Sequence, residues 1–334
     1  MEPGTENRWP LVAIVGPTAS GKSALALKLA EELGGEILNC DSIQVYRHLD
    51  IGSGKVPAEW RQRVPHHLLD IALPDEDFAA GDYRRIAEEV LREVRGRRRL
   101  PFVVGGTGLD LRALLVGLFE SPGPSESLRR RLADLAESKG RRYLHRILAR
   151  LDAPSAESIE PNDVQKVIRG LEVCLLARQR MSDLQARGRR PLAGFHVIEL
   201  GLNPPRPLLV ERIDRRVAEM FEAGLISEVE GLMKAGYSPR MKAFGALGYQ
   251  HAWGVLCGEL SREEAVAATQ KDTRRYAKRQ MTWFRHQVKP RWFEGLGDDP
   301  EVQGRVKKWL VGRLRNWPIP PEGGRFISAE SLRR

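Results

Sequence analysis

Eight consecutive residues near the start of the chain have the types and spacing of a phosphate-binding loop. Residues 16–23 fit the pattern G-x-x-x-x-G-K-[ST] in full, and they are Gly16, Pro17, Thr18, Ala19, Ser20, Gly21, Lys22 and Ser23. In such a loop (a P-loop), glycines let backbone N–H groups converge on phosphate oxygens, lysine adds a positive charge, and the last hydroxyl can hold Mg²⁺. The motif therefore predicts a pyrophosphate-bearing ligand, with Ser23 as the metal-binding residue, and does not specify ATP.

Asp41 is the second candidate for chemistry, because it closely follows a run at residues 36–39 that is expected to be a strand. In an open parallel sheet the carboxyl ends of the strands face the phosphate loop, so this carboxylate can reach the ligand that Lys22 holds. It can ligate magnesium or act as a general base for an incoming nucleophile. An Asp-Ser pair after a strand is also a common helix cap, and the residues alone leave these three roles open.

A glycine-rich segment, Gly105-Gly106-Thr107-Gly108, follows a third apolar run at 100–104. Its backbone is typical of an anion-binding nest, and the Thr107 hydroxyl is expected to project toward the same crevice as Asp41. No aspartate ends this third run, which counts against an ordinary motor-type or switch-type nucleotide hydrolase.

The segments that must position these residues alternate between strands and helices. Apolar runs at 11–15, 36–39 and 100–104 predict strands, and leucines at helical spacing in 24–33 predict a helix. Further elements are predicted as a strand at 195–202, a helix at 208–223, and a helix from the capping box at 261–264 to about residue 285. The fold class is therefore α/β: a P-loop parallel sheet with helices on both faces.

A helical insertion domain interrupts this pattern after the turn-forming residues at 121–124. From residue 125 to about 190, charged and leucine-spaced segments replace strands. Residues 161–163 mark a helix start, which places Val164, Ile168, Leu171 and Leu175 on one face. The predicted organisation is a catalytic core at 10–120 and 196–290, a helical insertion at 121–195, and a C-terminal tail at 291–334 that is mobile from residue 318.

The charge of the chain makes a polyanionic partner plausible. The 334 residues carry a formal net charge of +10, and arginines cluster at 97–99, 129–131, 141–142 and 187–190. Arginine-rich helices can also have solvated faces that bind no partner, so the charge by itself does not establish nucleic-acid binding. The segment at 273–285 mixes cations with aromatic residues, which suits nucleic acid, but for Trp283 and Phe284 we favour a role as core residues.

Several classes of site and location are not supported. Cys40, Cys174 and Cys257 are isolated in sequence and are interpreted as reduced packing thiols. His66 and His67 are adjacent and point in different directions, with no third ligand nearby, so a metal site there is disfavoured. No run approaches the roughly 18 apolar residues of a membrane span, so we expect a cytoplasmic protein without membrane contact.

Eight sequence blocks, taken in order, resemble the bacterial tRNA dimethylallyltransferases, also called tRNA isopentenyltransferases, over about residues 10 to 290. The blocks are GPTASGKS at 16–23, DSIQVY at 41–46, DIGSGK at 50–55, HHLLDI at 66–71, VGGTGL at 104–109, PNDVQKVIRGLEV at 161–173, GALGYQ at 245–250 and TRRYAKRQMTWFR at 273–285. The resemblance implies transfer of a dimethylallyl group from dimethylallyl diphosphate to the exocyclic N6 amine of the adenosine 3′-adjacent to the anticodon in tRNA. Mg²⁺ is the implied cofactor, and the P-loop would hold the diphosphate of the donor.

The resemblance also implies roles for individual residues. Asp41 would be the base or hydrogen-bond acceptor for the adenine amine, and Thr107 would contact the oxygen that bridges prenyl group and diphosphate. Lys22, Ser23 with Mg²⁺ and Arg216 would neutralise the leaving diphosphate. The target base must be flipped out of its stack to reach the crevice. A monomer is expected to grip the tRNA anticodon stem-loop with the insertion and to contact tRNA through Asp41, Ser42, Ile43, Gln44, Gln165, Lys166, Val167, Ile168, Arg169, Arg275 and Arg279.

Two departures and three rival functions accompany the resemblance. Asp110 stands where the family commonly has tyrosine, which leaves the outer wall of the donor channel uncertain, and Ser53-Gly54-Lys55 replaces a more usual Thr-Ala-Lys. The rivals are an adenylate isopentenyltransferase that prenylates a free nucleotide, a small-metabolite kinase that uses the P-loop for ATP, and a noncatalytic RNA-binding protein. The large basic insertion argues against the first rival, because a mononucleotide needs no such grip.

Overall fold

The chain forms an α/β core and a separate helical insertion. The computed structural model describes residues 8–239, 241–315 and 317. It divides into two compact units, Val116–Pro191 and the remainder of the chain, and each is described here by itself. The mobile segment predicted from residue 318 onward lies outside the described residues.

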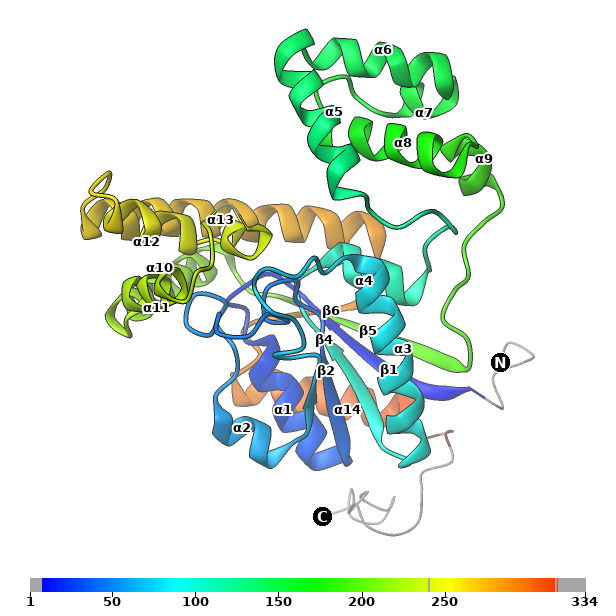
Figure 1. The fold of residues 1–334 in the computed structure, drawn as a ribbon. Coiled ribbons are helices and arrows are strands. Elements are labelled where there is room, and N and C mark those ends of the chain that lie inside the picture. Colours follow the sequence, from blue (N-terminus) through cyan, green and yellow to red (C-terminus); the bar gives the residue numbers. More distant parts are fainter. Residues whose placement is uncertain (1–7, 240, 316, 318–334) are drawn as a thin grey trace, which may run out of the picture. The chain divides into compact units, whose positions relative to one another are not determined.

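One parallel sheet organises the larger unit (Figure 1), which confirms the predicted fold class. Its strand order is β3-β2-β4-β1-β5-β6, and every neighbouring pair is parallel. The strands are β1 Trp9–Val15, β2 Gly35–Asn39, β3 His66–His67, β4 Leu100–Val104, β5 Phe195–Asn203 and β6 Arg291–Glu294. Because the strands run in one direction, the loops that follow them gather at one edge of the sheet.

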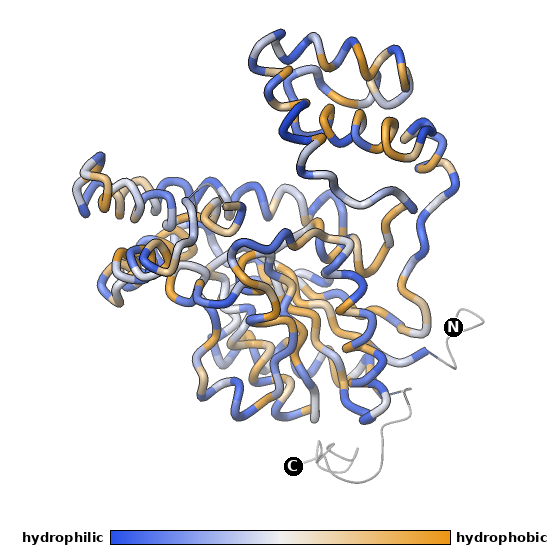
Figure 2. Tube along the Cα trace, in the orientation of Figure 1, coloured by the Kyte–Doolittle hydropathy of each residue, from blue (hydrophilic) through white to orange (hydrophobic). Residues whose placement is uncertain are grey.

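Helices cover both faces of the sheet because its central strands are apolar on both sides (Figure 2). Val12 and Ile14 of β1 face a core shared with helices α1 and α14, whereas Leu11 and Ala13 face α3 and α4. The bounds of these helices are α1 Lys22–Leu33, α3 Ala80–Gly96, α4 Gly108–Leu115 and α14 Pro300–Leu314, and the short α2 spans Ala58–Arg63.

A helical layer with its own apolar core belongs to the same unit. It consists of α10 Arg206–Glu222, α11 Leu225–Lys234, the 3₁₀ helix η1 Lys242–Gly245, α12 Tyr249–Leu256 and α13 Arg262–Gln287. The predicted capping box is confirmed: the Glu264 backbone N–H donates to Ser261 Oγ, and the Ser261 N–H donates to the Glu264 carboxylate. Phe284 is buried and Trp283 packs against the same core, as predicted.

The insertion is an all-helical unit with a compact apolar core. Its helices are α5 Glu126–Lys139, α6 Arg141–Leu151, α7 Ala153–Ser158, α8 Val164–Ala177 and α9 Met181–Ala186. Asp163 caps α8 as the sequence predicts, and Ile168 and Leu171 are buried. Leu175 was assigned to the same face but is 48% exposed, because the last turn of α8 buries Val173 and Cys174 instead.

The structure changes two predicted boundaries. The insertion begins at Val116 and ends at Pro191 rather than at 121 and 195. The prediction of a separate tail from residue 291 is wrong for residues 291–315. In this segment β6 joins the sheet, and α14 packs on the sheet through Val302, Val306, Leu310 and Leu314. Their i, i+4 spacing is typical of a helix with one apolar face, but the polar residues between them favoured the interpretation as a tail.

Two further expectations have structural outcomes. Cys40 and Cys174 are buried free thiols, as predicted, but Cys257 is exposed, so it is not a packing residue. Among the described residues, no helix combines the length and apolar character needed to cross a membrane.

Candidate active site

A cavity of about 730 Å³ lies where the loops gather at the carboxyl edge of the sheet. The P-loop, Asp41, the first two glycines of the 105–108 segment and the loop at 50–57 form part of its wall. Helices α10 and α13 contribute Arg212, Arg216, Tyr276 and Gln280. Residues from six separated parts of the sequence therefore meet around one space.

The P-loop joins β1 to α1, and its close packing explains the glycine at its end. Gly21 has φ 84°, and a Cβ there would lie 2.7 Å from the backbone nitrogen of Gly297. The Gly297 N–H donates to the Ser20 carbonyl at 2.8 Å. The turn after β6, which the sequence prediction assigned to a tail, thus supports the P-loop from behind.

Lys22 is buried at the start of α1, and its ammonium donates to the Pro17 carbonyl at 2.7 Å. Burial and the neighbouring Arg216 guanidinium lower the pKa of Lys22 to about 7, while Asp41 opposes the shift. A second negatively charged group in the cavity would raise the pKa of Lys22 and so favour its charged ammonium form. Lys22 and Arg216 therefore form a cationic site suited to an anion.

Asp41 lines the cavity with one carboxylate oxygen already fixed. Its Oδ1 accepts hydrogen bonds from the Ile43 N–H at 2.9 Å and the Gln44 N–H at 3.3 Å. This is the helix-cap geometry that the sequence analysis considered for Asp41. It orients the carboxylate through one of its two oxygens. No hydrogen bond to Oδ2 from the described residues is found, so that oxygen can accept a proton or hydrogen bond from a ligand.

Thr107 lies beside Asp41 but does not lie on the wall of the cavity. Its Oγ1 accepts a hydrogen bond from the Ser42 N–H at 3.1 Å, and its own N–H donates to the Cys40 carbonyl. The hydroxyl also interacts with the side chain of Tyr276, which lines the cavity, and it holds the segment that carries Asp41.

Gln280 is a site residue that the sequence analysis missed. Its Oε1 accepts from the Thr18 N–H at 2.8 Å, and its Nε2 donates to the Gly106 carbonyl at 3.0 Å. A Cβ on Gly106 would lie 2.1 Å from this Nε2, so the glycine makes room for the bridge. One buried amide thereby ties the P-loop to the 105–108 segment.

The signal for Gln280 was its spacing along α13. Thr269, Thr273, Tyr276 and Gln280 recur every three or four residues, and each lines one of the two neighbouring cavities. Burial and Asp41 raise the pKa of Tyr276 to about 12, against hydrogen bonds with Gln280 and Thr107 that lower it. The Tyr276 hydroxyl therefore stays protonated at neutral pH. Sequence reasoning considered its ring only for stacking or packing.

Arg212 and Arg216 lie one turn apart on α10, and both line the cavity. Arg212 donates to the Asp298 carboxylate at 2.6 Å, which gives the turn after β6 a second contact with the site. Arg216 packs against Gly54, where an added Cβ would overlap its guanidinium. Arg216 was predicted for the site, whereas the partnership of Arg212 with Asp298 was not.

A second, smaller cavity of about 310 Å³ adjoins the first. It shares Thr18, Ala19, Asp41 and Arg216 with the first cavity, so the two spaces adjoin at Asp41. Its apolar walls come from Ile43, Ile213, Val217, Met220 and Leu247. Of the predicted tRNA contacts, Ser42, Ile43 and Arg279 line this second cavity and Gln44 lines the first, whereas Arg275 is exposed and near Asp272.

Within the insertion, the structure corrects part of the predicted tRNA contact. Gln165 and Lys166 are exposed on α8, but Val167 and Ile168 are buried in the core of the insertion, so their side chains are not available to a ligand. Arg169 donates to the fully buried Glu172 and to Ser121. It is held inside this unit because a buried carboxylate needs its counter-charges.

Metal-binding groups are sparse, which restricts how a cation can be held. Within 8–239, 241–315 and 317 there is no group of three or more histidine, cysteine, aspartate or glutamate side chains suited to a metal. His67 contacts Glu36, and His66 contacts the Val64 carbonyl. Ser23 is exposed on the cavity wall, where its hydroxyl is accessible.

Asp110, which replaces the expected tyrosine, is buried in α4. Burial and the nearby Asp41 raise its pKa to about 7, while Lys242 lowers it. It does not line either of the two neighbouring cavities. Its influence on the site is therefore electrostatic and acts on Asp41.

Comparisons with known proteins agree on one family. A family model described as IPP transferase matches residues 44–287. The chain is 52% identical over 296 residues to a tRNA dimethylallyltransferase of Koribacter versatilis, which covers 89% of this chain and 96% of the relative. It is 50% identical over 305 residues to a tRNA dimethylallyltransferase of Solibacter usitatus, with 90% and 99% covered.

Solved structures are similar over nearly the whole chain. The full-length tRNA isopentenylpyrophosphate transferase from Bacillus halodurans superposes with a TM-score of 0.66 at 36% identity, covering 91% of this chain and 96% of that one. A eukaryotic dimethylallyltransferase, crystallised in snapshots of its action on tRNA, gives a TM-score of 0.77 at 25% identity, covering 94% and 81%.

Replacing Gln280 tests the bridge between the P-loop and the 105–108 segment. Gln280→Leu keeps the apolar bulk but leaves the Thr18 N–H and the Gly106 carbonyl without partners. An unpaired buried polar group costs about 1–3 kcal/mol, so we expect the Kd for inorganic pyrophosphate to rise at least about tenfold by calorimetry. Thr282→Val, an exposed change on the same helix, should leave the Kd unchanged. An unaltered Kd in Gln280→Leu would show that the bridge does not support the anion site.

Replacing Asp110 tests the electrostatic cost of this side chain. Because its folded pKa lies above the ordinary aspartate value, the folded chain retains a proton that the unfolded chain loses between about pH 4 and 7, so stability falls as pH rises. In urea unfolding, the free energy of unfolding of Asp110→Asn should equal that of the wild type near pH 4 and exceed it by about 4 kcal/mol at pH 8. Asp75→Asn, at an exposed position, is the control. A pH-independent difference would contradict the assignment.

Proposed function

This chain belongs to the IPP transferase family, and from that premise we propose that it is a tRNA dimethylallyltransferase. The reaction transfers a dimethylallyl group from dimethylallyl diphosphate to the N6 amine of the adenosine 3′-adjacent to the anticodon in tRNA, and releases diphosphate. The observation that carries the proposal is the position of Asp41. It lies where a cationic cavity suited to diphosphate adjoins a smaller cavity with apolar walls.

The cationic cavity fits the diphosphate of the donor. Lys22 and Arg216 supply positive charge near the P-loop, and Ser23 lies in the first turn of α1, whose N-terminus favours anions. Negative charge grows on the diphosphate as its bond to the allylic carbon breaks. Cations fixed beforehand stabilise that charge at little reorganisation cost.

A magnesium ion is compatible with the residues present. Mg²⁺ in such sites keeps several waters and is held by one or two protein oxygens together with substrate phosphates, so a large protein ligand set is unnecessary. We propose Ser23 Oγ as its protein ligand. When bound, the ion would share the charge of the leaving diphosphate.

Asp41 is proposed to act on the acceptor. As the adenine N6 attacks C1 of the dimethylallyl group, the carbon–oxygen bond to diphosphate breaks and N6 must lose a proton. Asp41 Oδ2 can take that proton, because Oδ1 is fixed by the two backbone N–H groups of Ile43 and Gln44. The apolar walls of Ile213, Val217 and Met220 suit a five-carbon prenyl group and exclude water from it.

The insertion and the basic side chains are proposed to bind the anticodon stem-loop. Gln165 and Lys166 are exposed on α8, and Arg275 and Arg279 are exposed on α13. Such groups neutralise phosphates and would make binding dependent on salt. We further propose that the enzyme works as a monomer in the cytoplasm, since one chain supplies every residue assigned to the site.

A transfer assay with matched variants tests the proposal. Purified protein, radiolabelled dimethylallyl diphosphate, Mg²⁺ and unmodified tRNA should give labelled tRNA, and Asp41→Asn should lower kcat about 10²–10⁴-fold because the base is lost. Asp75→Asn should have wild-type activity. Label entering AMP instead of tRNA would establish the free-nucleotide rival. Phosphoryl transfer from ATP without prenyl transfer would establish a kinase.

The pKa of Lys22 gives the donor site a specific pH dependence. Above about pH 7 the free enzyme must take up a proton to present a charged Lys22, so pyrophosphate affinity should fall by up to about tenfold per pH unit through this group. Lys22→Arg stays charged and should remove that one-proton slope between pH 7 and 9, by calorimetry. The ionisations of pyrophosphate are common to both proteins. Equal slopes would refute the role of Lys22.

A further inference from the structure

The loop at residues 50–55 forms one wall of the donor cavity. Asp50, Ile51, Ser53, Gly54 and Lys55 all line this space. The loop has no regular secondary structure, so its shape depends on side chains that hold its backbone. Two charged residues do this, Lys55 from inside the loop and Glu228 from helix α11.

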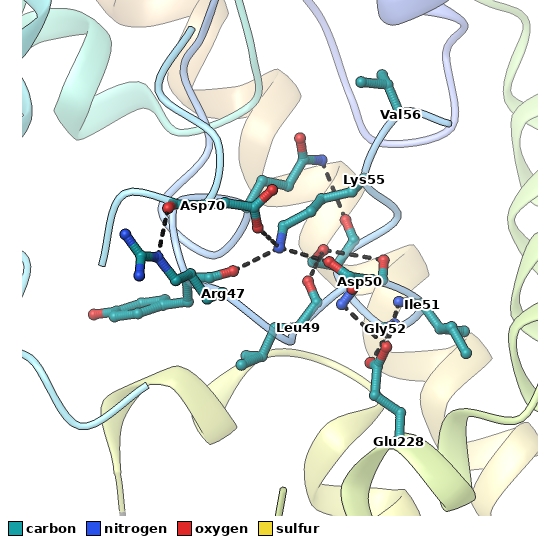
Figure 3. Close-up of polar contacts among 12 residues, drawn as sticks. Arg47, Leu49, Asp50, Ile51, Gly52, Lys55, Val56, Asp70 and Glu228 are labelled. Carbon is teal, nitrogen blue, oxygen red and sulfur yellow. Dashed lines mark hydrogen bonds and ion pairs between the residues drawn. The ribbon is translucent and has the colours of Figure 1, made fainter. Parts of the chain in front are cut away.

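Lys55 is an internal support of the loop rather than a ligand for diphosphate. Its side chain is only 2% exposed. Its ammonium donates to the Tyr46 carbonyl at 2.6 Å, to Asp50 at 2.7 Å and to Asp70 at 2.5 Å. An ammonium has three protons, and all three are used, as Figure 3 shows. No donor of Lys55 remains for a phosphate.

Glu228 holds the other side of the loop. Its carboxylate accepts hydrogen bonds from three successive backbone N–H groups, those of Asp50 at 3.1 Å, Ile51 at 2.8 Å and Gly52 at 3.3 Å. Tyr249 of α12 donates its hydroxyl to Glu228 Oε1 at 2.7 Å. Burial and the Glu228 carboxylate raise the pKa of Tyr249, so the hydroxyl keeps its proton. The negative charge thus has four donors.

The loop in turn positions the segment of the catalytic base. The Gln44 amide Nε2 donates to the Ser53 carbonyl at 3.2 Å and to the Gly54 carbonyl at 3.4 Å. The Gln44 backbone N–H donates to Asp41 Oδ1. A continuous set of hydrogen bonds therefore connects Glu228, the loop, Gln44 and the Asp41 carboxylate.

We propose that Glu228 is a positioning residue for Asp41, acting through the 50–54 loop and Gln44. This inference rests on the proposed function, in which Asp41 is the base. Charge-assisted hydrogen bonds to backbone N–H groups are roughly twice as strong as neutral ones, and a carboxylate can accept at both oxygens. Glutamine at 228 would offer one acceptor oxygen and would point N–H donors at backbone donors.

The first experiment measures the loop directly, without reference to catalysis. Hydrogen–deuterium exchange of a peptide that covers residues 47–56 should be faster in Glu228→Gln than in the wild type, because three amides lose their acceptor. Glu230→Gln is the matched control, since Glu230 is exposed on the same helix and pairs with Lys234. Unchanged exchange in Glu228→Gln would show that the Glu228 carboxylate does not hold the backbone of the 50–54 loop.

The second experiment is a double-mutant cycle on transfer to tRNA. A small displacement of a catalytic group can cost about 10²-fold in rate, so Glu228→Gln should lower kcat at least about tenfold. In an Asp41→Asn background the same change should lower kcat less than twofold, because the group it positions is already disabled. The Kd and stoichiometry for pyrophosphate should stay at wild-type values. Equal losses in both backgrounds, or a lowered stoichiometry, would show a general structural effect and overturn the proposal.

Failure of the proposed function and failure of the proposed role of Glu228 give different experimental results. If the wild-type protein transfers no dimethylallyl group to tRNA, the proposed function is wrong, and the exchange experiment alone decides whether Glu228 clamps the loop. If the wild type is active, the cycle decides whether the clamp serves Asp41. Should Glu228→Gln not fold, Glu228→Asp replaces it. Its shorter carboxylate cannot reach all three amides, so faster exchange and the same non-additive loss are expected.

Discussion

Uncompensated positive charge inside the donor cavity is the constraint on which the rest of the site depends. Burial lowers the pKa of both Lys22 and Arg216, and the Arg216 guanidinium lowers that of Lys22 further. Asp41 opposes the shift in both cases. Two cations held in this wall favour the binding of an anion. Removing the anion or the carboxylate would leave charge in a medium that solvates it poorly.

Such a site must be built from loops, and here each loop is held by a side chain from a distant helix. Gln280 of α13 bridges the P-loop and the 105–108 segment. Glu228 of α11 holds the 50–54 loop, and Asp298, after β6, holds Arg212. A loop without regular secondary structure has backbone groups that need partners, and these partners also fix where the loop lies. The helical layer over the sheet edge is therefore part of the active site.

The sequence was informative wherever the relevant interaction is local. The strands and helices around the P-loop, the capping box of α13 and the convergence of Lys22 and Asp41 follow from patterns within a few residues or from parallel topology, whereas Arg216 was implied by the family resemblance alone. Prediction failed where a neighbour decides the outcome. Val167 and Ile168 belong to one of the eight blocks but are buried by the other helices of the insertion. Residues 300–314 look polar, yet their apolar stripe packs on the sheet.

The sequence by itself determined the chemical class of the protein, because a phosphate loop and the order of eight short blocks require no knowledge of distant contacts. Only the tertiary structure decided which side chains are available for chemistry. The Thr107 hydroxyl accepts from the Ser42 N–H, and Gln280 and Glu228 reach loops far away in sequence. These outcomes depend on hydrogen-bond partners separated by tens to hundreds of residues, and a local pattern does not contain that information.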